Sequence, residues 1–205
     1  MNFFTEHKKK KITILLGHPD AVHETLSKNL ALIYEASAKA AGHEVKRFNL
    51  FDLKFDPVLH EGYRTIQALE PDLVMLQDAI KWCDHFVLIY PTWWSGMPGP
   101  LKGLFDRIWL PAFAFNMRKN KQGTPALGWK KRLKGKTARV ITLTGQHPFG
   151  IQILFGDYTN EITRAILWFA GFKVRLTKWG PSEIAPEWLK NSWRRKVAHL
   201  GKMGE

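Results

Sequence analysis

The chain alternates short apolar segments with longer segments of helical periodicity, and this alternation constrains its fold more than any other feature. The apolar segments are rich in β-branched and aromatic residues, which is typical of strands buried in a parallel sheet. These predicted strands cover residues 11–16, 43–48, 84–90, 136–144 and 172–179. Apolar residues at helical spacing predict helices over 25–41, 71–82, 98–110, 158–169 and 186–200. We therefore expect an α/β protein.

One doubly wound sheet accounts for this order of elements. Right-handed crossovers between parallel strands cover both faces of the sheet with helices, and five strands favour the order 2-1-3-4-5. We expect residues 1–205 to form a single three-layer domain. Two segments should lie outside the regular pattern: a flexible basic arm over 1–10, and an aromatic and basic insertion over 112–134.

Basic residues dominate the chain, whose formal net charge is +13. Between Arg107 and Gly156 there is no Asp or Glu, whereas Lys and Arg are frequent. This basic segment could be a solvated surface, or it could attract nucleic acid, anionic lipid or a phosphorylated cofactor. Only the charge supports nucleic acid, so we expect no nucleic-acid partner.

Cysteine content and hydropathy exclude further classes of protein. Cys83 is the single cysteine, which excludes an internal disulfide and a cysteine-based zinc site. Its place before a predicted strand favours a buried, unreactive thiol. No apolar run reaches the length of a membrane span, and the run that follows the N-terminal lysines is too short for a signal peptide. We therefore expect a cytoplasmic protein.

A loop rich in proline and tryptophan follows the third predicted strand, with the sequence Pro91-Thr92-Trp93-Trp94-Ser95-Gly96-Met97-Pro98. Ligands of open α/β sheets bind at this carboxyl edge of the strands. Adjacent residues of an extended segment point to opposite sides, so we expect one of the two tryptophans to pack inward and the other to line a pocket. An aromatic wall of this kind suits a flat, aromatic ligand.

Two further loops should meet this one at the same edge of the sheet. Residues 17–25 end at a predicted helix N-terminus, where free N–H groups and the helix dipole favour a phosphate. His18 and Thr25 could add hydrogen bonds, although Thr25 would also serve as a plain N-cap. Residues 144–150 offer backbone amides and His147. The first loop lacks the glycine spacing of nucleotide-binding motifs, and the three loops together suit a flavin best.

Several of these segments resemble the NAD(P)H:quinone oxidoreductases, the DT-diaphorase-like members of the flavodoxin-like superfamily. The resemblance covers roughly residues 11–180, and the proline–tryptophan loop is its most specific part. It rests on His18-Pro19, the run from Pro91 to Pro98, Leu101-Lys102-Gly103, Asp106-Arg107 and Gly171-Phe172. It implies a flavodoxin-like three-layer fold, a bound FMN or FAD, and a homodimer with two active sites at its interface.

The activity that the resemblance implies is a ping-pong transfer of two electrons. Hydride would pass from NADH or NADPH through the flavin to a quinone-like aromatic acceptor. The basic segment could favour NADPH through its extra phosphate, and the lack of a long C-terminal extension favours FMN over FAD. No metal site is expected, because the sequence shows no ligand spacing for one.

The resemblance also assigns roles to individual residues. His18 and Thr25 would hold the phosphate, with His23 as the alternative to Thr25 in the same loop. Phe115 and Met117 would contact the acceptor. His147 would take the catalytic position, because the tyrosine that some members carry beyond this loop is not found here. The isoalloxazine ring would be wrapped by Pro91, Thr92, Trp93, Trp94 and Ser95, with Thr144, Gly145 and Gln146 at its polar edge.

Two alternatives to the enzyme stay open. One is a flavin-binding regulatory or ancillary subunit of a membrane transporter, such as a potassium efflux system, which would dock through the basic segment. The other is a flavodoxin-type one-electron carrier. Carriers of that kind are typically acidic, so the net charge of this chain disfavours the second alternative.

Overall fold

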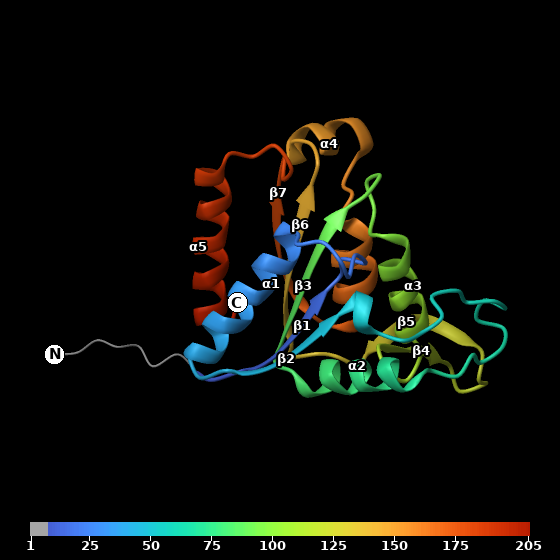
Figure 1. Cartoon of the computed structure of the whole chain (residues 1–205). Helices are drawn as coiled ribbons and strands as arrows, with labels where there is room; N and C mark the ends of the chain where they lie inside the picture. Colours follow the sequence, from blue (N-terminus) through green and yellow to red (C-terminus); the bar gives the residue numbers. More distant parts are fainter. Residues whose placement is uncertain (1–7) are drawn as a thin grey trace.

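Five parallel strands form the central sheet of the computed structural model, which describes residues 8–205 (Figure 1). The strands are β1 (Lys11–Leu16), β2 (Glu44–Asn49), β3 (His85–Thr92), β6 (Thr137–Thr144) and β7 (Lys173–Trp179). Their order is β2-β1-β3-β6-β7, which confirms the predicted order 2-1-3-4-5. Most of the predicted N-terminal arm, residues 1–7, lies outside the described residues.

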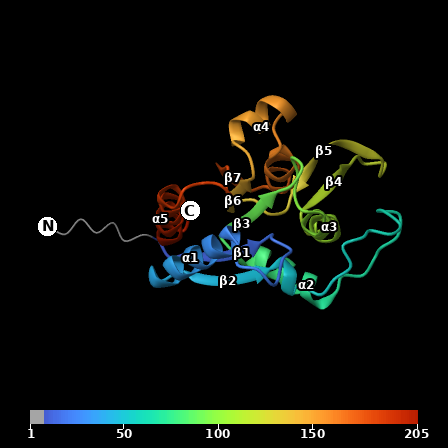
Figure 2. The ribbon, with the colours of Figure 1, turned by 45° about the horizontal axis from the view of Figure 1, so that its top comes forward.

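Helices cover both faces of this sheet and complete three layers (Figures 1 and 2). The helices are α1 (Leu26–Ala40), α2 (Pro71–Trp82), α3 (Gly99–Ile108), the π-helix η2 (Glu161–Trp168) and α5 (Glu187–Met203), with a short 3₁₀ turn η1 (Leu50–Asp52) after β2. One core joins α1 and α5 to strand residues such as Ile14 and Val87. The other joins α2, α3 and η2 to residues such as Leu15 and Leu88, which alternate with the first set along the same strands.

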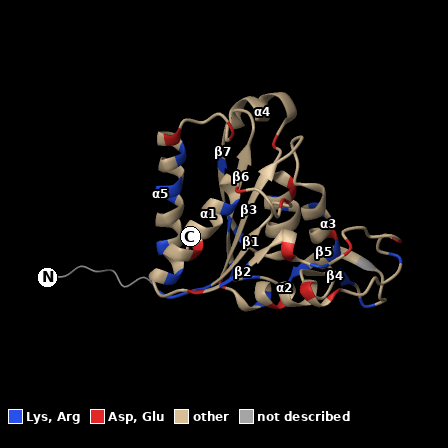
Figure 3. Cartoon of the chain, viewed as in Figure 1, with Lys and Arg blue, Asp and Glu red and all other residues tan. Residues whose placement is uncertain are grey.

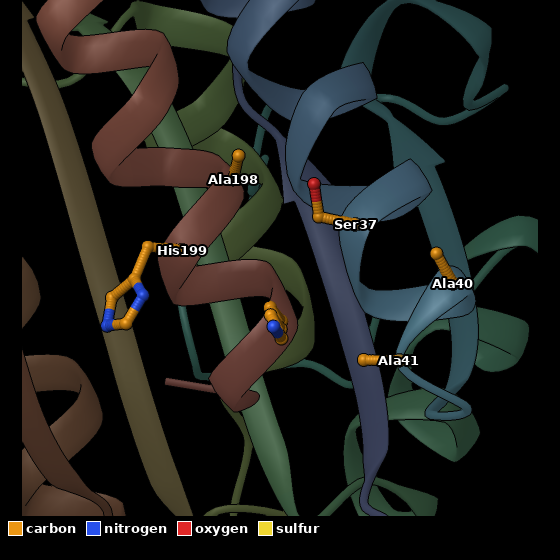
Figure 4. A pocket seen from close by; sticks show the side chains of 6 residues that line it. Ser37, Ala40, Ala41, Ala198 and His199 are labelled. Carbon is orange, nitrogen blue, oxygen red and sulfur yellow. The ribbon is translucent and has the colours of Figure 1, made fainter.

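Small residues let α1 and α5 approach closely on their side of the sheet. A Cβ added at Gly201 of α5 would lie 2.6 Å from the carbonyl oxygen of Tyr34 on α1. Figure 4 shows the shallow groove beside this contact, where Ser37 and Ala40 of α1 face Ala198 of α5. The chain end is thereby fixed against α1, next to the first residues of the strands.

The aromatic and basic insertion over 112–134 contains a β-hairpin of β4 (Phe115–Lys119) and β5 (Pro125–Lys131). Asn120 builds its turn, because the Asn120 side chain accepts hydrogen bonds from the backbone N–H of Gln122 and Thr124, both at 3.0 Å. The hairpin packs on η2: Trp129 stacks on Phe169 with ring centroids 4.4 Å apart. The Asx turn and the packing on η2 thus stabilise regular structure in the insertion.

One correction concerns residues 144–150, which were expected to be a loop. The loop is shorter, because helix α4 (Pro148–Phe155) begins at Pro148. Its sequence, PFGIQILF, is almost continuously apolar and shows no helical periodicity, and none of its residues is buried. A periodic pattern arises only where a helix buries one face, so this helix gave no such signal. Among residues 8–205 no helix is both long and apolar enough to cross a membrane.

A buried arginine fastens the long connection between β2 and α2 to the core. Arg107 of α3 is 1% exposed, and its guanidinium donates to both carboxylate oxygens of Glu70, at 3.1 and 2.9 Å. The same group donates to the backbone carbonyls of Asp56 and Ala68. Burial acts to raise the pKa of Glu70, but hydrogen bonds from backbone amides and from Arg107 outweigh it and lower that pKa.

The Arg107 contacts predict the largest stability loss from a single charge change in the described residues. Arg107→Met should lower the free energy of unfolding by about 3 kcal/mol, because Glu70 and two carbonyls lose their donor. Because the folded-state pKa of Glu70 is lowered, this stabilisation is present at neutral pH and is lost as the pH falls through that pKa. Urea unfolding at pH 7 and pH 4 checks both points. The control Arg118→Met, at an exposed position of β4, should change the unfolding free energy little; equal effects of the two variants would contradict the role of Arg107.

Candidate functional site

Loops from three strands meet at the carboxyl edge of the sheet, as the sequence predicted. β3 and β6 pair in register up to Thr92 opposite Thr144, so the loops after these strands start side by side. The loop after β1 joins them, because the N–H of Gly17 donates to the carbonyl of Ile89 at 2.8 Å. The rings of His18 and Trp93 then meet edge to face, with centroids 6.1 Å apart. The three predicted loops therefore form one surface.

Charged and polar contacts hold the first loop in place. Asp20 accepts hydrogen bonds from the backbone N–H of Val22 and His23 and from the His23 ring, and these contacts lower the pKa of Asp20 well below its usual range. Lys28 is 8% exposed and donates to two loop carbonyls, those of Ala21 at 3.1 Å and His23 at 2.6 Å. The sequence gave no signal for this buried lysine. It adds a positive charge below the N-terminus of α1.

His18 is held in one tautomer. Its Nδ1 accepts a hydrogen bond from the backbone N–H of Asp20 at 3.1 Å, so the proton of the neutral ring lies on Nε2. Burial and the nearby Lys28 lower the pKa of His18, while Asp20 opposes them, and the ring is neutral at pH 7. His18 therefore presents an N–H donor. Thr25 is the N-cap of α1, with its hydroxyl accepting from the N–H of Lys28 at 3.3 Å.

The second loop is a tight two-residue turn. Trp93 and Gly96 exchange backbone hydrogen bonds of 3.0 and 2.9 Å, and both central residues have positive φ, 48° at Trp94 and 58° at Ser95. This is the conformation that glycine and asparagine favour, so a tryptophan there is strained. Trp93 is 46% exposed and Trp94 is 102% exposed. The expectation that one tryptophan packs into the core was wrong, because the turn directs both side chains out of the sheet.

The third loop is fixed from beneath. The Thr144 hydroxyl donates to the carbonyls of Gln146 at 2.6 Å and Trp179 at 3.2 Å, and the N–H of Ser182 donates to the Thr144 carbonyl at 2.8 Å. Gly180 packs so closely that an added Cβ would lie 2.1 Å from the Thr144 hydroxyl. Thr144 thus stabilises the conformation of the loop. Gly145 and Gln146 are exposed on its outer side.

Helix α4 forms an apolar flank of this surface, which the sequence did not predict. Phe149, Ile153, Leu154 and Phe155 are each 68–74% exposed. His147, the predicted catalytic residue, lies at the N-cap position of α4 and is exposed. Pro91 and Thr92, at the end of β3, are half-buried beside the loop, and the Thr92 hydroxyl is hydrogen-bonded to that of Thr142.

Phe115 and Met117 do not join this surface. Both lie on β4, which Figure 1 places beside α3 and away from α4 and the turn after β3. Phe115 packs edge to face on Phe169, with centroids 5.1 Å apart, whereas Met117 is 57% exposed. The structure therefore brings together the residues predicted to bind a cofactor and separates them from the two predicted to bind the acceptor.

The basic segment is only partly free to bind a partner. The ammonium of Lys131 lies 3.4 Å from the ring centroid of Trp168 and donates to the Trp168 carbonyl. Arg132 donates to the carbonyl of Ala112. Figure 3 shows that Lys and Arg also occur on α5 and where β1 and β2 begin, so positive charge is not confined to the hairpin. Among the described residues no cluster of His, Cys, Asp and Glu could hold a metal ion.

Comparisons with known proteins agree with the fold and with the resemblance in the sequence. An NAD(P)H oxidoreductase of Haemophilus influenzae is 30% identical over 105 residues, which are 50% of this chain and 52% of that protein. The chain therefore spans about half the length of that relative. NAD(P)H dehydrogenase [quinone] 1 of Cavia porcellus is 24% identical and covers 93% of this chain and 77% of its own. The crystal structure of Smu.1420 from Streptococcus mutans superposes with a TM-score of 0.75 at 27% identity, over 93% of this chain and 98% of that one.

The sequence model of one family, described as flavodoxin-like fold, matches residues 10–177. These residues run from the start of β1 into β7 and so include all three loops of the site. The chain belongs to the flavodoxin-like fold family, and its relatives are NAD(P)H and quinone oxidoreductases, as the resemblance in its sequence indicates.

Proposed function

We propose that this protein is a flavin-dependent NAD(P)H:quinone oxidoreductase. The observation that carries the proposal is the meeting of three loops at the carboxyl edge, where the His18 and Trp93 rings touch beside the N-terminus of α1. That edge offers a phosphate site, an aromatic surface and exposed backbone amides together. Relatives named NAD(P)H oxidoreductase and NAD(P)H dehydrogenase [quinone] support the same activity.

The phosphate of FMN or FAD would lie at the N-terminus of α1. The first N–H groups of a helix have no intrahelical acceptor and its dipole favours an anion. His18 adds the Nε2–H donor that its hydrogen bond with Asp20 leaves free, and Thr25 adds a hydroxyl. Lys28 supplies a nearby positive charge that is already fixed by two carbonyls. The residues present therefore fit a phosphate monoester.

The ring system of the flavin would rest on the segment Pro91–Ser95, with Gly145 and Gln146 at its polar edge. A bound flavin supplies hydride acceptance from NADH or NADPH and two-electron reduction of a quinone-like acceptor in alternating half-reactions. The chain orients the ring through the tight turn at Trp94 and Ser95, which positions both tryptophans outside the core. His147, exposed at the N-cap position of α4, would act at the rim of the site.

A homodimer would complete the acceptor pocket. The apolar side chains of α4 and the Trp94 ring remain exposed in one protomer, and surfaces of this kind are usually covered by a partner. Phe115 and Met117 lie away from their own loops, so they can contact the acceptor only from the second copy. The pocket formed this way would be apolar and would suit a flat aromatic acceptor.

The regulatory alternative has less support. A subunit that docks on a membrane transporter through the basic segment needs free cationic side chains there. Lys131 and Arg132 are instead engaged with Trp168 and Ala112 within the chain. The segment still carries exposed Arg118, Lys119, Lys121, Lys130 and Lys134. These five leave a smaller basic surface than the sequence alone suggested.

The absorption spectrum of the purified protein tests the proposed function directly. We expect flavin bands that bleach within seconds when NADPH or NADH is added under anaerobic conditions and return when a quinone is added. Acid release of the cofactor followed by mass analysis then decides between FMN and FAD. A colourless protein that takes up neither flavin would contradict the proposal, and a flavoprotein that neither nicotinamide reduces would favour the regulatory alternative.

The strained turn gives a prediction that separates stability from cofactor binding. Replacing Trp94→Asn and Ser95→Gly provides the residues that this turn favours, so the free energy of unfolding should rise by about 1 kcal/mol or more. Flavin affinity should fall about fivefold or more, because a stacking ring is lost. The comparison variant Ser95→Gly relaxes the turn but keeps the ring, and should lower affinity much less than the double variant. Thermal unfolding and flavin titration measure both effects; unchanged affinity in the double variant would remove Trp94 from the site.

Gly180 provides a prediction about the third loop. Gly180→Ala should displace the loop at Thr144 and lower flavin affinity at least tenfold, although residue 180 need not touch the cofactor. Its matched control is Gly150→Ala in α4, where an added Cβ meets nothing within 4 Å. Flavin titration of both variants, with circular dichroism to confirm folding, checks the effect. Equal affinities would show that the position of Thr144 does not matter for binding.

A further inference from the structure

A pocket lies at the amino edge of the sheet. Figure 1 shows that this edge is at the opposite end of the strands from the loops of the candidate site. The cavity measures about 280 Å³ and lies between the first residues of β3, β6 and β7 and the end of α5. The side chains that carry its chemistry are Lys10, His85, Thr137, Lys173, Arg175 and Glu205. The proposed enzyme reaction uses none of them.

His85 is the buried polar group of this pocket. Its side chain is 2% exposed, and its Nδ1 lies 2.7 Å from the hydroxyl of Thr137, on the neighbouring strand. Its Nε2 is also buried and has no hydrogen-bond partner among residues 8–205. Burial, together with Lys10, Arg139 and Arg175, lowers the pKa of His85 to about 3 against an opposing contribution from the backbone of Glu205, so the ring is neutral. A buried donor or acceptor without a partner is costly, and a ligand in the pocket would relieve that cost.

Positive charge dominates the walls of the pocket. Lys10, Lys173 and Arg175 line it, and among the described residues one carboxylate, that of Glu205, lines it as well. Arg175 donates to the Glu205 carboxylate at 2.5 Å, and the buried Arg139 lies 4.0 Å from the same oxygen. The Nε of Arg139 has no hydrogen-bond partner among the described residues. Glu205 is thus an internal anion that neutralises only part of the cluster.

The negative partial charge at the C-terminus of α5 does not explain why these cations gather there. The dipole of α5 places negative partial charge at its C-terminus, which by itself would disfavour an anion. That end is already compensated, because the ammonium of Lys10 donates to the carbonyl of Gly204 at 2.7 Å and the His43 ring lies 3.2 Å from the carbonyl of Lys202. Lys173 and Arg175, on β7, take no part in this compensation, and Arg175 shares its charge only with Glu205.

We propose that this amino-edge pocket binds a small phosphate-bearing anion, with His85 Nε2, Lys173 and Arg175 as donors and Glu205 as the internal competitor. Arginine and lysine together recognise phosphate oxygens, and a guanidinium can donate two hydrogen bonds to one phosphate. The cavity is slightly below the usual range for small-molecule pockets, so the ligand is inorganic phosphate or a small phosphate monoester. Its binding is independent of the flavin reaction.

Calorimetric titration with inorganic phosphate, at fixed ionic strength in a phosphate-free buffer, measures the binding. Arg175→Gln should weaken binding at least fivefold, because a donor pair and a positive charge are lost. Glu205→Gln should tighten it at least threefold, because the competing carboxylate is removed. Arg195→Gln, on the exposed side of α5, makes the same charge change away from the pocket and should have no effect. Opposite effects of the first two variants distinguish a site from general charge.

A second readout locates the ligand. The ¹⁵N resonances of the His85 ring should shift on addition of phosphate in the wild type and much less in Arg175→Gln. Binding that survives Arg175→Gln but disappears in Thr25→Val would place the phosphate at the N-terminus of α1 and overturn the proposal. Adenosine 5′-monophosphate, compared with adenosine, decides the source: tighter binding than phosphate indicates a monoester, and equal or weaker binding indicates the free ion. If neither phosphate nor adenosine 5′-monophosphate shifts the ¹⁵N resonances of the His85 ring, the proposal is also overturned.

Discussion

The pairing of β3 with β6 is the constraint on which both edges of the molecule depend. Eight residue pairs in register, from His85 opposite Thr137 to Thr92 opposite Thr144, fix these strands at the centre of the sheet. Because the two strands are parallel, one register aligns their residues at both ends of the pair. At the carboxyl edge it aligns the tryptophan turn with the Thr144 loop. At the amino edge it places His85 against the Thr137 hydroxyl and, through the pairing of β6 with β7, beside Lys173.

The carboxyl edge carries the strain that the rest of the fold supports. Trp94 and Ser95 hold positive φ angles although neither is glycine, and conformations of this kind persist only where surrounding contacts determine them. Those contacts are the paired hydrogen bonds between Trp93 and Gly96 and the packing of His18 against Trp93. A chain selected only for stability would place asparagine and glycine in such a turn. The stability of the turn therefore does not explain the tryptophan at position 94, whose ring is fully exposed.

Much of this architecture could be predicted from the sequence, because its strands and long helices each bury a face. The strand order, the N-cap at Thr25 and the convergence of three loops follow from apolar patterning and crossover rules. Helix α4 could not be predicted, since a helix with no buried side chain leaves no periodic pattern. The turn of the hairpin could have been predicted, because Asn120 is followed three residues later by a glycine, Gly123, whose φ is 80°. The burial of Lys28 and His85 could not be predicted from the sequence, because it arises only from the tertiary structure.

The two proposed anion sites would reach their affinity by different physical means. At the carboxyl edge helices begin, so backbone N–H groups and dipoles provide positive potential, and a neutral His18 with one fixed lysine is enough. At the amino edge helices end, and the potential of the backbone is negative. An anion site there must be built from side-chain cations that exceed the local carboxylates, which is the composition found around His85. The excess of cations at an edge where the backbone disfavours anions is the strongest reason to treat that pocket as a site rather than as surface charge.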